Sequence, residues 1–321
     1  MDIYSEKDRF ITLSESQLRQ LSDAQAVLRH SRVARQEAQE VRGSMRWKTV
    51  GGRQYLLRVS PRGAERSLGP QTQETQAIFD AFHSRKSSAQ ARLAAMRQRM
   101  DEMRQLNRVY QIGRAPSILV RCLNALEDAG LAQQFLVVGT HALYAYETAA
   151  GVRVQSGSMA TQDLDLLFDV RKLRAFTTLL KRTELRSLIA VLQRADKTFK
   201  VRRDKLETAV NDDGFEVDII RRMQVDGDPH PLRLSDDEND FWAVQADQGQ
   251  AMASSPRFAQ MVVSPQGEMA IMHTLHPLVF IRLKHALAQR LGRDPLKAPK
   301  DKLQAQVVQA LWDRYLQFLP A

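Results

Sequence analysis

Two aspartates separated by one residue lie within an apolar stretch, the run TQDLDLLFD at 161–169. Alternation along a β-strand would place Leu164, Leu166 and Phe168 on one face. Asp163 and Asp165 would share the other, about 7 Å apart. Two carboxylates in an apolar setting are costly to desolvate without a counter-charge. Mg²⁺ suits this role because it binds one or two carboxylates and keeps its other positions for water and substrate phosphates.

The spacing alone does not establish a metal site. Asp226-Gly227-Asp228 has the same spacing but lies in a stretch rich in Gly, Pro and His, which is typical of a loop. The alternative for the first pair is an exposed pair on a solvated strand face. Its apolar, β-rich setting favours the metal site.

A third carboxylate lies in a second strand-like run, GFEVDII at 214–220. Turn-forming residues at 211–214 join this run to 206–210 and predict a β-hairpin. Asp218 is flanked by valine and isoleucine in the middle of the run, whereas Glu216 lies nearer the rim. A strand beside the first would bring Asp218 to the same cation.

A small-residue turn follows a third apolar run, QFLVV at 134–138. Gly139 and Thr140 end this expected strand, and a short helical pattern begins at Ala142. Glycine lets backbone N–H groups approach a phosphate, the threonine hydroxyl can donate, and the helix dipole favours negative charge. Many strand–Gly–helix junctions bind nothing, and the chain has no GxxxxGK[ST] loop.

The elements that must position these motifs follow from periodicity and turn residues. Helices are expected over 14–41, from about 72 to 110, over 117–129, from 277 and from 300, and hairpins over 45–59 and 261–271. A polar segment with Gly63, Gly69 and Pro70 follows the first hairpin.

Three parts are therefore expected along the chain. These are an N-terminal helical region with a β-hairpin at 1–112, a mixed core at 113–240, and a mostly helical C-terminal region at 241–321. A cleft between the last two would hold a ligand, as interfaces between domains often do.

Taken in order, these motifs resemble the nucleotidyltransferase superfamily, the fold of DNA polymerase β, CCA-adding enzymes and antibiotic nucleotidyltransferases. The string VVGTHALYAYETAAGV, followed by MATQDLDLLFD, is similar to an uncharacterised bacterial branch of stand-alone members. That branch is related to abortive-infection-type nucleotidyltransferase toxins. The resemblance implies an α+β fold with a polymerase-β-like mixed-sheet core and helical N- and C-terminal regions.

The resemblance also implies roles for individual residues. Gly139 and Thr140 would hold a nucleoside triphosphate, and Asp163, Asp165 and Asp218 would bind two Mg²⁺ or Mn²⁺ ions. By analogy with the toxin-like relatives, Lys284 in the helix from 277 would reach phosphate, and Asp301 would have a polar or structural role. The alternative for Lys284 and Asp301 is that both are ordinary charges on amphipathic helices.

One departure from the family pattern concerns spacing. Gly139 and Asp163 are 24 positions apart, longer than the usual connection. We therefore expect 147–162, with Gly151 and Ser156–Ser158, to be an inserted loop.

The implied reaction transfers a nucleoside monophosphate from a triphosphate to a hydroxyl, with release of pyrophosphate. The acceptor is open between an RNA (tRNA) 3′ end, a protein side chain and a small molecule. A non-catalytic nucleotide- or RNA-binding module and a metal-dependent phosphoesterase are the alternatives to transfer. The toxin-like resemblance adds an antitoxin protein as a partner to consider.

The charge of the chain favours a polyanionic partner. Lys and Arg number 47 against 37 Asp and Glu, a net charge of +10. Two runs are strongly basic: 171–203 has eleven basic residues and two acids, and 85–108 has seven and two. Each run by itself is typical of a solvated helix face, and together they favour RNA.

Cysteine usage and hydropathy predict the compartment. The single cysteine, Cys122, lies in an apolar helical pattern and is expected to be a packing residue. The first ten residues lack an apolar signal core, and no run approaches the roughly 20 apolar residues of a membrane span. We expect a cytoplasmic protein without a membrane partner.

Overall fold

The computed structural model of the chain describes residues 10–155, 159, 161–183 and 185–319. The chain divides into two compact units, one containing 1–18 and 110–321 and the other containing 19–109. We call the first the sheet unit and the second the hairpin unit, and each is described by itself.

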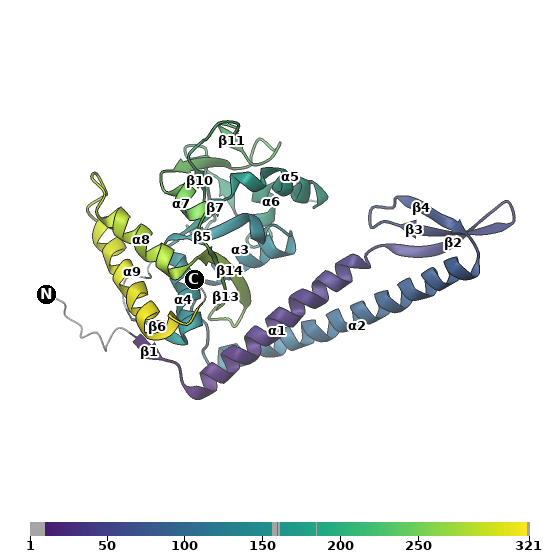
Figure 1. The fold of residues 1–321 in the computed structure, drawn as a ribbon, viewed down its shortest axis with the longest axis horizontal. Coiled ribbons are helices and arrows are strands. Elements are labelled where there is room, and N and C mark those ends of the chain that lie inside the picture. The colour runs from purple at the N-terminus through teal and green to yellow at the C-terminus, as the bar shows by residue number, and fades with distance from the viewer. Residues whose placement is uncertain (1–9, 156–158, 160, 184, 320–321) are drawn as a thin grey trace. The chain divides into compact units, whose positions relative to one another are not determined.

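The hairpin unit consists of two long helices with a small sheet between them in the chain (Figure 1). Its elements are α1 (Glu15–Glu40, whose first residues belong to the sheet unit), β2 (Ser44–Val50), β3 (Arg53–Val59), β4 (Glu65–Pro70) and α2 (Gln73–Val109). The predicted helices and hairpin are confirmed. The sequence did not predict β4, which lies in the polar segment after the hairpin and pairs with β3 through backbone hydrogen bonds that polar residues make as readily as apolar ones.

Side-chain contacts hold the hairpin unit together along its length. Gln20 Nε2 donates to Asn107 Oδ1 at 3.0 Å, and Arg92 donates to both carboxylate oxygens of Glu37 at 2.9 Å. These two contacts, 17 positions apart on α1 and 15 on α2, fit an antiparallel helix pair. At the sheet, the Arg58 guanidinium lies 4.5 Å from the Phe82 ring centroid.

The sheet unit is built on a mixed sheet of nine strands in the part of the chain that the structure describes. The strand order is β11-β12-β10-β7-β5-β14-β13, and β9 pairs with both β10 and β8. The strands are β5 (Phe135–Val138), β7 (Asp163–Phe168), β8 (Lys200–Val201), β9 (Thr208–Val210), β10 (Glu216–Arg222), β11 (Leu232–Arg233), β12 (Trp242–Ala246), β13 (Arg257–Val263) and β14 (Met269–Leu275). Because β7 and β10 are parallel while β5 and β7 are antiparallel, the α+β mixed-sheet prediction is confirmed.

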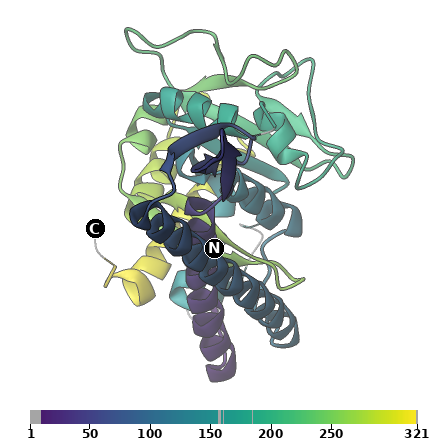
Figure 2. The same cartoon turned by 90° about the vertical axis from the view of Figure 1, so that its right-hand side faces the viewer.

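Helices cover both faces of this sheet (Figures 1 and 2). They are α3 (Ser117–Asp128), α4 (Ala142–Ala150), α5 (Leu173–Arg182), α6 (Leu188–Leu192), α7 (Gly249–Ala253), α8 (Pro277–Ala288) and α9 (Lys297–Leu311). The apolar residues of β7 and β10 pack with α3, α5 and α6 in the main core. On the opposite face, β5 and β14 pack with α7 and α8, and α9 packs on α4 and α8. None of the described helices is long and apolar enough to cross a membrane.

The inserted loop predicted at 147–162 is wrong for its first part. Helix α4 continues to Ala150, and Gly151 ends it at a φ of +64°. Strand β6 (Val152–Val154) then pairs with β1 (Phe10–Thr12). The predicted Ser156–Ser158 segment lies outside the described residues.

Candidate functional site

The strand register brings the predicted carboxylates side by side. In the parallel pair of β7 and β10, Asp163 lies opposite Glu216, and Asp165 lies opposite Asp218. The apolar residues between them, such as Leu164 and Val217, are fully buried on the other face of the sheet. Alternation thus directs the acidic side chains toward the face that carries α7 and α8.

The small-residue turn at Gly139 lies against the carboxylate of Asp165. Gly139 follows β5 with a φ of +71°, and a Cβ at this position would overlap Asp165 Oδ2. Val138, the residue before it, pairs with Asp165 across the antiparallel strands. Glycine is therefore required both by the backbone conformation and by the approach of the carboxylate.

The environment of Asp165 opposes its ionisation. Burial, together with the neighbouring charges of Asp218 and Asp163, raises the pKa of Asp165 to about 6. The positive charges of Lys284 and Lys205 act in the opposite direction. The carboxylates of Asp163 and Asp218 and the ammonium groups of Lys284 and Lys205 therefore all act on the charge of Asp165.

Asp218 has partners that sequence reasoning missed. The Thr208 hydroxyl donates to Asp218 Oδ1, and Lys205 Nζ donates to the two carboxylate oxygens at 3.3 and 3.4 Å. The antiparallel register of β9 and β10 places Thr208 opposite Asp218. Glu216, predicted to lie at the rim, accepts from Arg202 at 3.0 Å.

Thr140 lies in the short turn that precedes α4 and is largely buried. Its Oγ1 accepts a hydrogen bond from Gln304 Nε2 of α9 at 2.9 Å. Gln304 is fully buried, so α9 is fixed against the turn at this point. The next residue, His141, pairs through Nδ1 with the backbone oxygen of Asp163 at 3.0 Å, and its burial lowers the pKa of the imidazole to about 4. The small-residue turn is thus joined to β7 and to α9.

Lys284 lies on α8 within an ion-pair network. Its Nζ donates to Asp301 Oδ1 at 2.7 Å, and Arg293 donates to Asp301 Oδ2 at 2.8 and 2.6 Å. The Lys284 and Asp301 side chains are 11% and 4% exposed, so neither is a solvated surface charge. Burial lowers the pKa of Lys284, although its ammonium group keeps the Asp301 partner.

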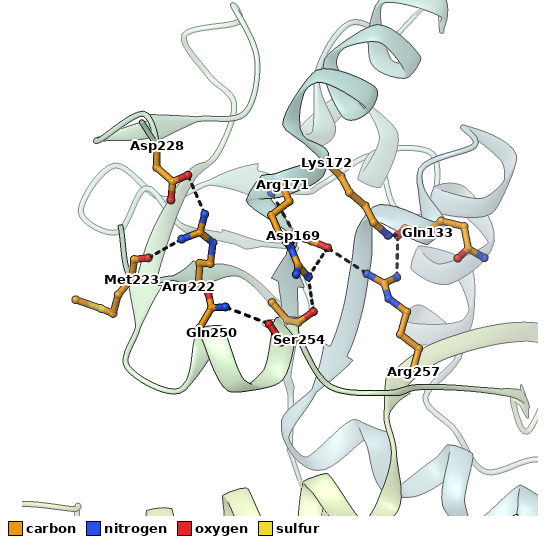
Figure 3. A network of polar contacts seen from close by, with 11 residues as sticks. Gln133, Asp169, Arg171, Lys172, Arg222, Met223, Asp228, Gln250, Ser254 and Arg257 are labelled. Carbon is orange, nitrogen blue, oxygen red and sulfur yellow. Dashed lines mark hydrogen bonds and ion pairs between the residues drawn. The ribbon is translucent and has the colours of Figure 1, made fainter. Parts of the chain in front are cut away.

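The basic run 171–203 is partly engaged in structural contacts. Arg171 Nε donates to Asp169 at 2.8 Å, and Arg257 of β13 lies 3.6 Å from the same carboxylate (Figure 3). Lys172 donates to the backbone oxygen of Gln133 at 2.9 Å. Asp169 follows the C-terminal end of β7, whereas Asp163 begins the strand. This network therefore lies apart from the acidic site.

Comparison with known proteins identifies the family. A family model described as nucleotidyltransferase matches residues 117–321, well over half of the chain. The chain belongs to the nucleotidyltransferase family. Searches of the curated proteins and of the solved structures found no match.

Family membership makes the chain an enzyme that uses a nucleoside triphosphate. Nucleotidyltransferases generally use divalent metal ions. Within the described residues, no group of three or more His, Cys, Asp or Glu side chains is arranged so that it could hold a metal as it stands. The Asp218 carboxylate instead accepts hydrogen bonds from Lys205 and Thr208.

The donor chemistry of this nucleotidyltransferase nevertheless fits a divalent cation. Asp163, Asp165 and Asp218 supply only carboxylate oxygens, the ligands that Mg²⁺ and Mn²⁺ prefer. Burial first, and then the charges of Asp218 and Asp163, raise the pKa of Asp165, so its surroundings favour the neutral form unless a positive charge is added. A divalent cation bound among the three side chains would offset their negative charges.

Proposed function

We propose that this nucleotidyltransferase transfers a nucleoside monophosphate from a triphosphate to a hydroxyl group, with two Mg²⁺ or Mn²⁺ ions held by Asp163, Asp165 and Asp218. The observation that supports it is the strand register, which sets Asp165 beside Asp218 on one strand pair and against Gly139 on the other. Acidic side chains next to a glycine turn are suited to phosphate chemistry because cations and backbone donors meet there.

Each group then has a distinct role. The backbone N–H groups of the turn beginning at Gly139 contact the triphosphate. Thr140 accepts from Gln304, which leaves its own hydroxyl proton to donate to phosphate. Lys284, held by Asp301, adds positive charge on the α8 side of the site.

The reaction balances without a further reactant. The acceptor hydroxyl oxygen forms a bond to the α-phosphorus, the bond between the α-phosphorus and the bridging oxygen breaks, and pyrophosphate leaves. Asp218 is the group assigned to take the hydroxyl proton. Divalent cations bound by the three carboxylates would stabilise the entering and leaving oxygens.

An RNA 3′ end, such as that of tRNA, is the acceptor that we propose. The basic run 85–108 lies on α2, where its arginines are exposed. RNA offers a terminal hydroxyl together with a phosphate backbone that such a surface attracts.

The test is label transfer by the purified full chain. It is incubated with each of the four α-³²P-labelled triphosphates, Mg²⁺ or Mn²⁺, and total cellular RNA. Wild-type protein should label RNA, and Asp165→Asn and Asp218→Asn should each lower the rate by about 10³-fold or more. Asp226→Asn is the matched control, because it alters the same Asp-x-Asp spacing in an exposed loop.

Full activity in both Asp165→Asn and Asp218→Asn would refute the site assignment. Label on protein instead of RNA would move the proposed acceptor to a protein side chain. Release of pyrophosphate without labelled product would replace transfer with hydrolysis.

A further inference from the structure

The positive charge of the chain is concentrated in the hairpin unit. Residues 19–109 contain 18 Lys and Arg against 8 Asp and Glu. This difference equals the whole net charge of +10, and the remaining residues contain 29 of each sign. The family match begins at residue 117, so this charge lies outside the matched part.

The type of basic residue also differs between the two units. The hairpin unit has 16 arginines and 2 lysines, whereas the rest of the chain has 19 and 10. Arginine binds phosphate through a planar, bidentate fork and stacks on flat rings, which lysine cannot do. This composition therefore favours a partner with phosphates and aromatic bases.

One face of the three-stranded sheet brings two of these arginines together with a lysine and a tyrosine. Residues paired across antiparallel strands share a face, and the register pairs Lys48 with Tyr55 and Val50 with Arg53. Arg46 lies on the same face, since it is two positions from Lys48. Arg46, Lys48 and Arg53 are exposed, and Tyr55 is half-buried among them.

The opposite face of this sheet is covered. Trp47 packs against Phe79 of α2 with ring centroids 5.7 Å apart, and Arg58 lies over Phe82. On the face that carries Arg46, the residue paired with it, Leu57, is buried, whereas the cations and Val50 are exposed.

Among the described residues, one carboxylate forms ion pairs with the cations of this face. Glu65 of β4 forms an ion pair with Arg46 and lies 3.5 Å from Lys48. One negative charge cannot neutralise two cations and the nearby Arg53, so the face keeps a net positive charge. Exposed pairs of this kind contribute little stability and exchange readily for another anion.

We propose that this exposed sheet face, defined by Arg46, Lys48, Arg53 and Tyr55, is an RNA-binding surface. RNA would then be the acceptor in the proposed transfer reaction, and this part of the inference rests on the proposed function. Binding of RNA to the face does not require the reaction. The cations contact the phosphate backbone, and Tyr55 provides a ring on which a base stacks.

The composition of the face disfavours a lipid surface. Membrane-surface binding relies on large apolar side chains that enter the headgroup region. Val50 is the one exposed large apolar side chain among the described residues of β2, β3 and β4. Charge without apolar anchors fits a polymer of phosphates better.

Binding of bulk tRNA and of a labelled poly(U) to the full chain tests this surface. Measurements are made without nucleotide and in the Asp165→Asn background, so that the transfer reaction does not contribute to the binding signal. The variant Arg46→Gln with Lys48→Gln and Arg53→Gln removes three charges from the face. Its matched control, Arg174→Gln with Lys181→Gln and Arg182→Gln, removes the same residue types from exposed positions on α5.

The face variant should weaken RNA binding at least tenfold at about 100 mM KCl and lower the slope of log Kd against log salt by roughly 2, since each lost contact to single-stranded phosphate removes about 0.7. The α5 control should bind as the parent does. Circular dichroism of both variants checks that the sheet and helices remain.

Equal RNA binding by the face variant and its parent would overturn the inference. The face variant is also measured against vesicles that contain anionic lipid. If it loses binding to these vesicles while its RNA binding is unchanged, the inference is overturned in favour of a lipid surface. The outcomes separate the two proposals: RNA binding that depends on the face without any label transfer leaves this surface standing and removes the proposed reaction. If the face substitutions leave both RNA binding and label transfer to RNA unchanged, the proposed reaction stands and this surface is removed.

Discussion

At residue scale, the buried carboxylate of Asp165 is suited to binding a cation, but its charge lowers the stability of the fold. Asp165 lies beside Asp218 and against Gly139, in surroundings that disfavour its charge. Such an arrangement destabilises a protein unless a ligand compensates for it. This conflict distinguishes Asp165 from Asp226, which has the same local spacing but is exposed.

Replacing Gly139 by alanine tests the close approach of the turn. Gly139→Ala adds a Cβ that overlaps Asp165 Oδ2 at a φ of +71°, whereas Gly130→Ala has a φ of +73° and meets nothing within 4 Å. Both variants should lose roughly 1 to 2 kcal/mol of stability from the left-handed conformation. Only Gly139→Ala should lower transfer, by about 100-fold or more. Equal activities of the two variants, measured by label transfer, would contradict the tight approach.

The pH dependence of stability tests the charge conflict at Asp165. Its pKa is about 6 in the folded chain against an ordinary value of 3.8, so the folded state holds the proton more tightly. The free energy of unfolding of metal-free protein should therefore fall as pH rises from about 4 to about 6. Asp165→Asn removes this loss and should be more stable than wild type above pH 6, by roughly 1 to 3 kcal/mol.

Urea unfolding in EDTA at several pH values measures this difference, which should vanish near pH 4. Added Mg²⁺ should stabilise wild type and not the variant, because only the charged carboxylate binds the cation. A variant less stable than wild type at pH 7.5 in EDTA would show that the carboxylate is not under electrostatic strain.

At element scale, the site depends on an element that is far away in the sequence. Helix α9 packs on α4, and its buried Gln304 bonds to Thr140 at the start of that helix. Helix α8 carries Lys284, whose position is fixed by Asp301 of α9. The C-terminal helices therefore position Thr140 and Lys284, the two side chains that we propose to contact phosphate.

Thr140 and Gln304 should behave as a coupled pair. Thr140→Val removes the acceptor of a buried amide and should cost about 1 to 3 kcal/mol of stability, as well as lowering transfer. Gln304→Leu in the Thr140→Val background should recover stability but not transfer, and Thr140→Ser should keep both. Urea unfolding in a double-mutant cycle measures the coupling, expected at about 0.5 kcal/mol or more. Additive single effects would show that the contact is not energetically significant.

At the scale of the whole molecule, the chain leaves the sheet unit and returns to it at neighbouring points. Gln17 Nε2 donates to the backbone oxygen of Tyr110 at 2.9 Å, just before and just after the hairpin unit in the chain. A domain inserted between adjacent points can be removed without breaking the surrounding fold.

Replacing 19–109 by a short Gly/Ser linker should therefore leave a folded sheet unit. The shortened protein should unfold cooperatively, and a triphosphate with Mg²⁺ should raise its melting temperature by as much as that of the full chain. RNA affinity should fall at least tenfold, because all of the net positive charge is removed. Differential scanning fluorimetry and RNA binding are the two measurements. Loss of the nucleotide-dependent shift would show that the hairpin unit is required for the nucleotide site.

Local patterns predicted much of the fold and the candidate residues. Alternation in the runs around Asp165 and Asp218 predicted strands with the correct faces buried, and the Gly139 turn followed from a glycine at the end of an apolar run. Strand β4 was missed because its polar residues show no apolar alternation. The loop predicted from 147 was wrong because motif spacing was given more weight than the helix-forming residues before Gly151.

By itself, the sequence determined which side chains lie on which face of each strand, because alternation is a property of the local backbone. Only the tertiary structure decided that β10 lies parallel to β7 in the register that pairs Asp218 with Asp165, since strand neighbours are chosen by packing of the whole sheet. The partners Lys205, Gln304 and Asp301 were decided in the same way. Their roles arise from contacts between elements, and no spacing along the chain encodes such contacts.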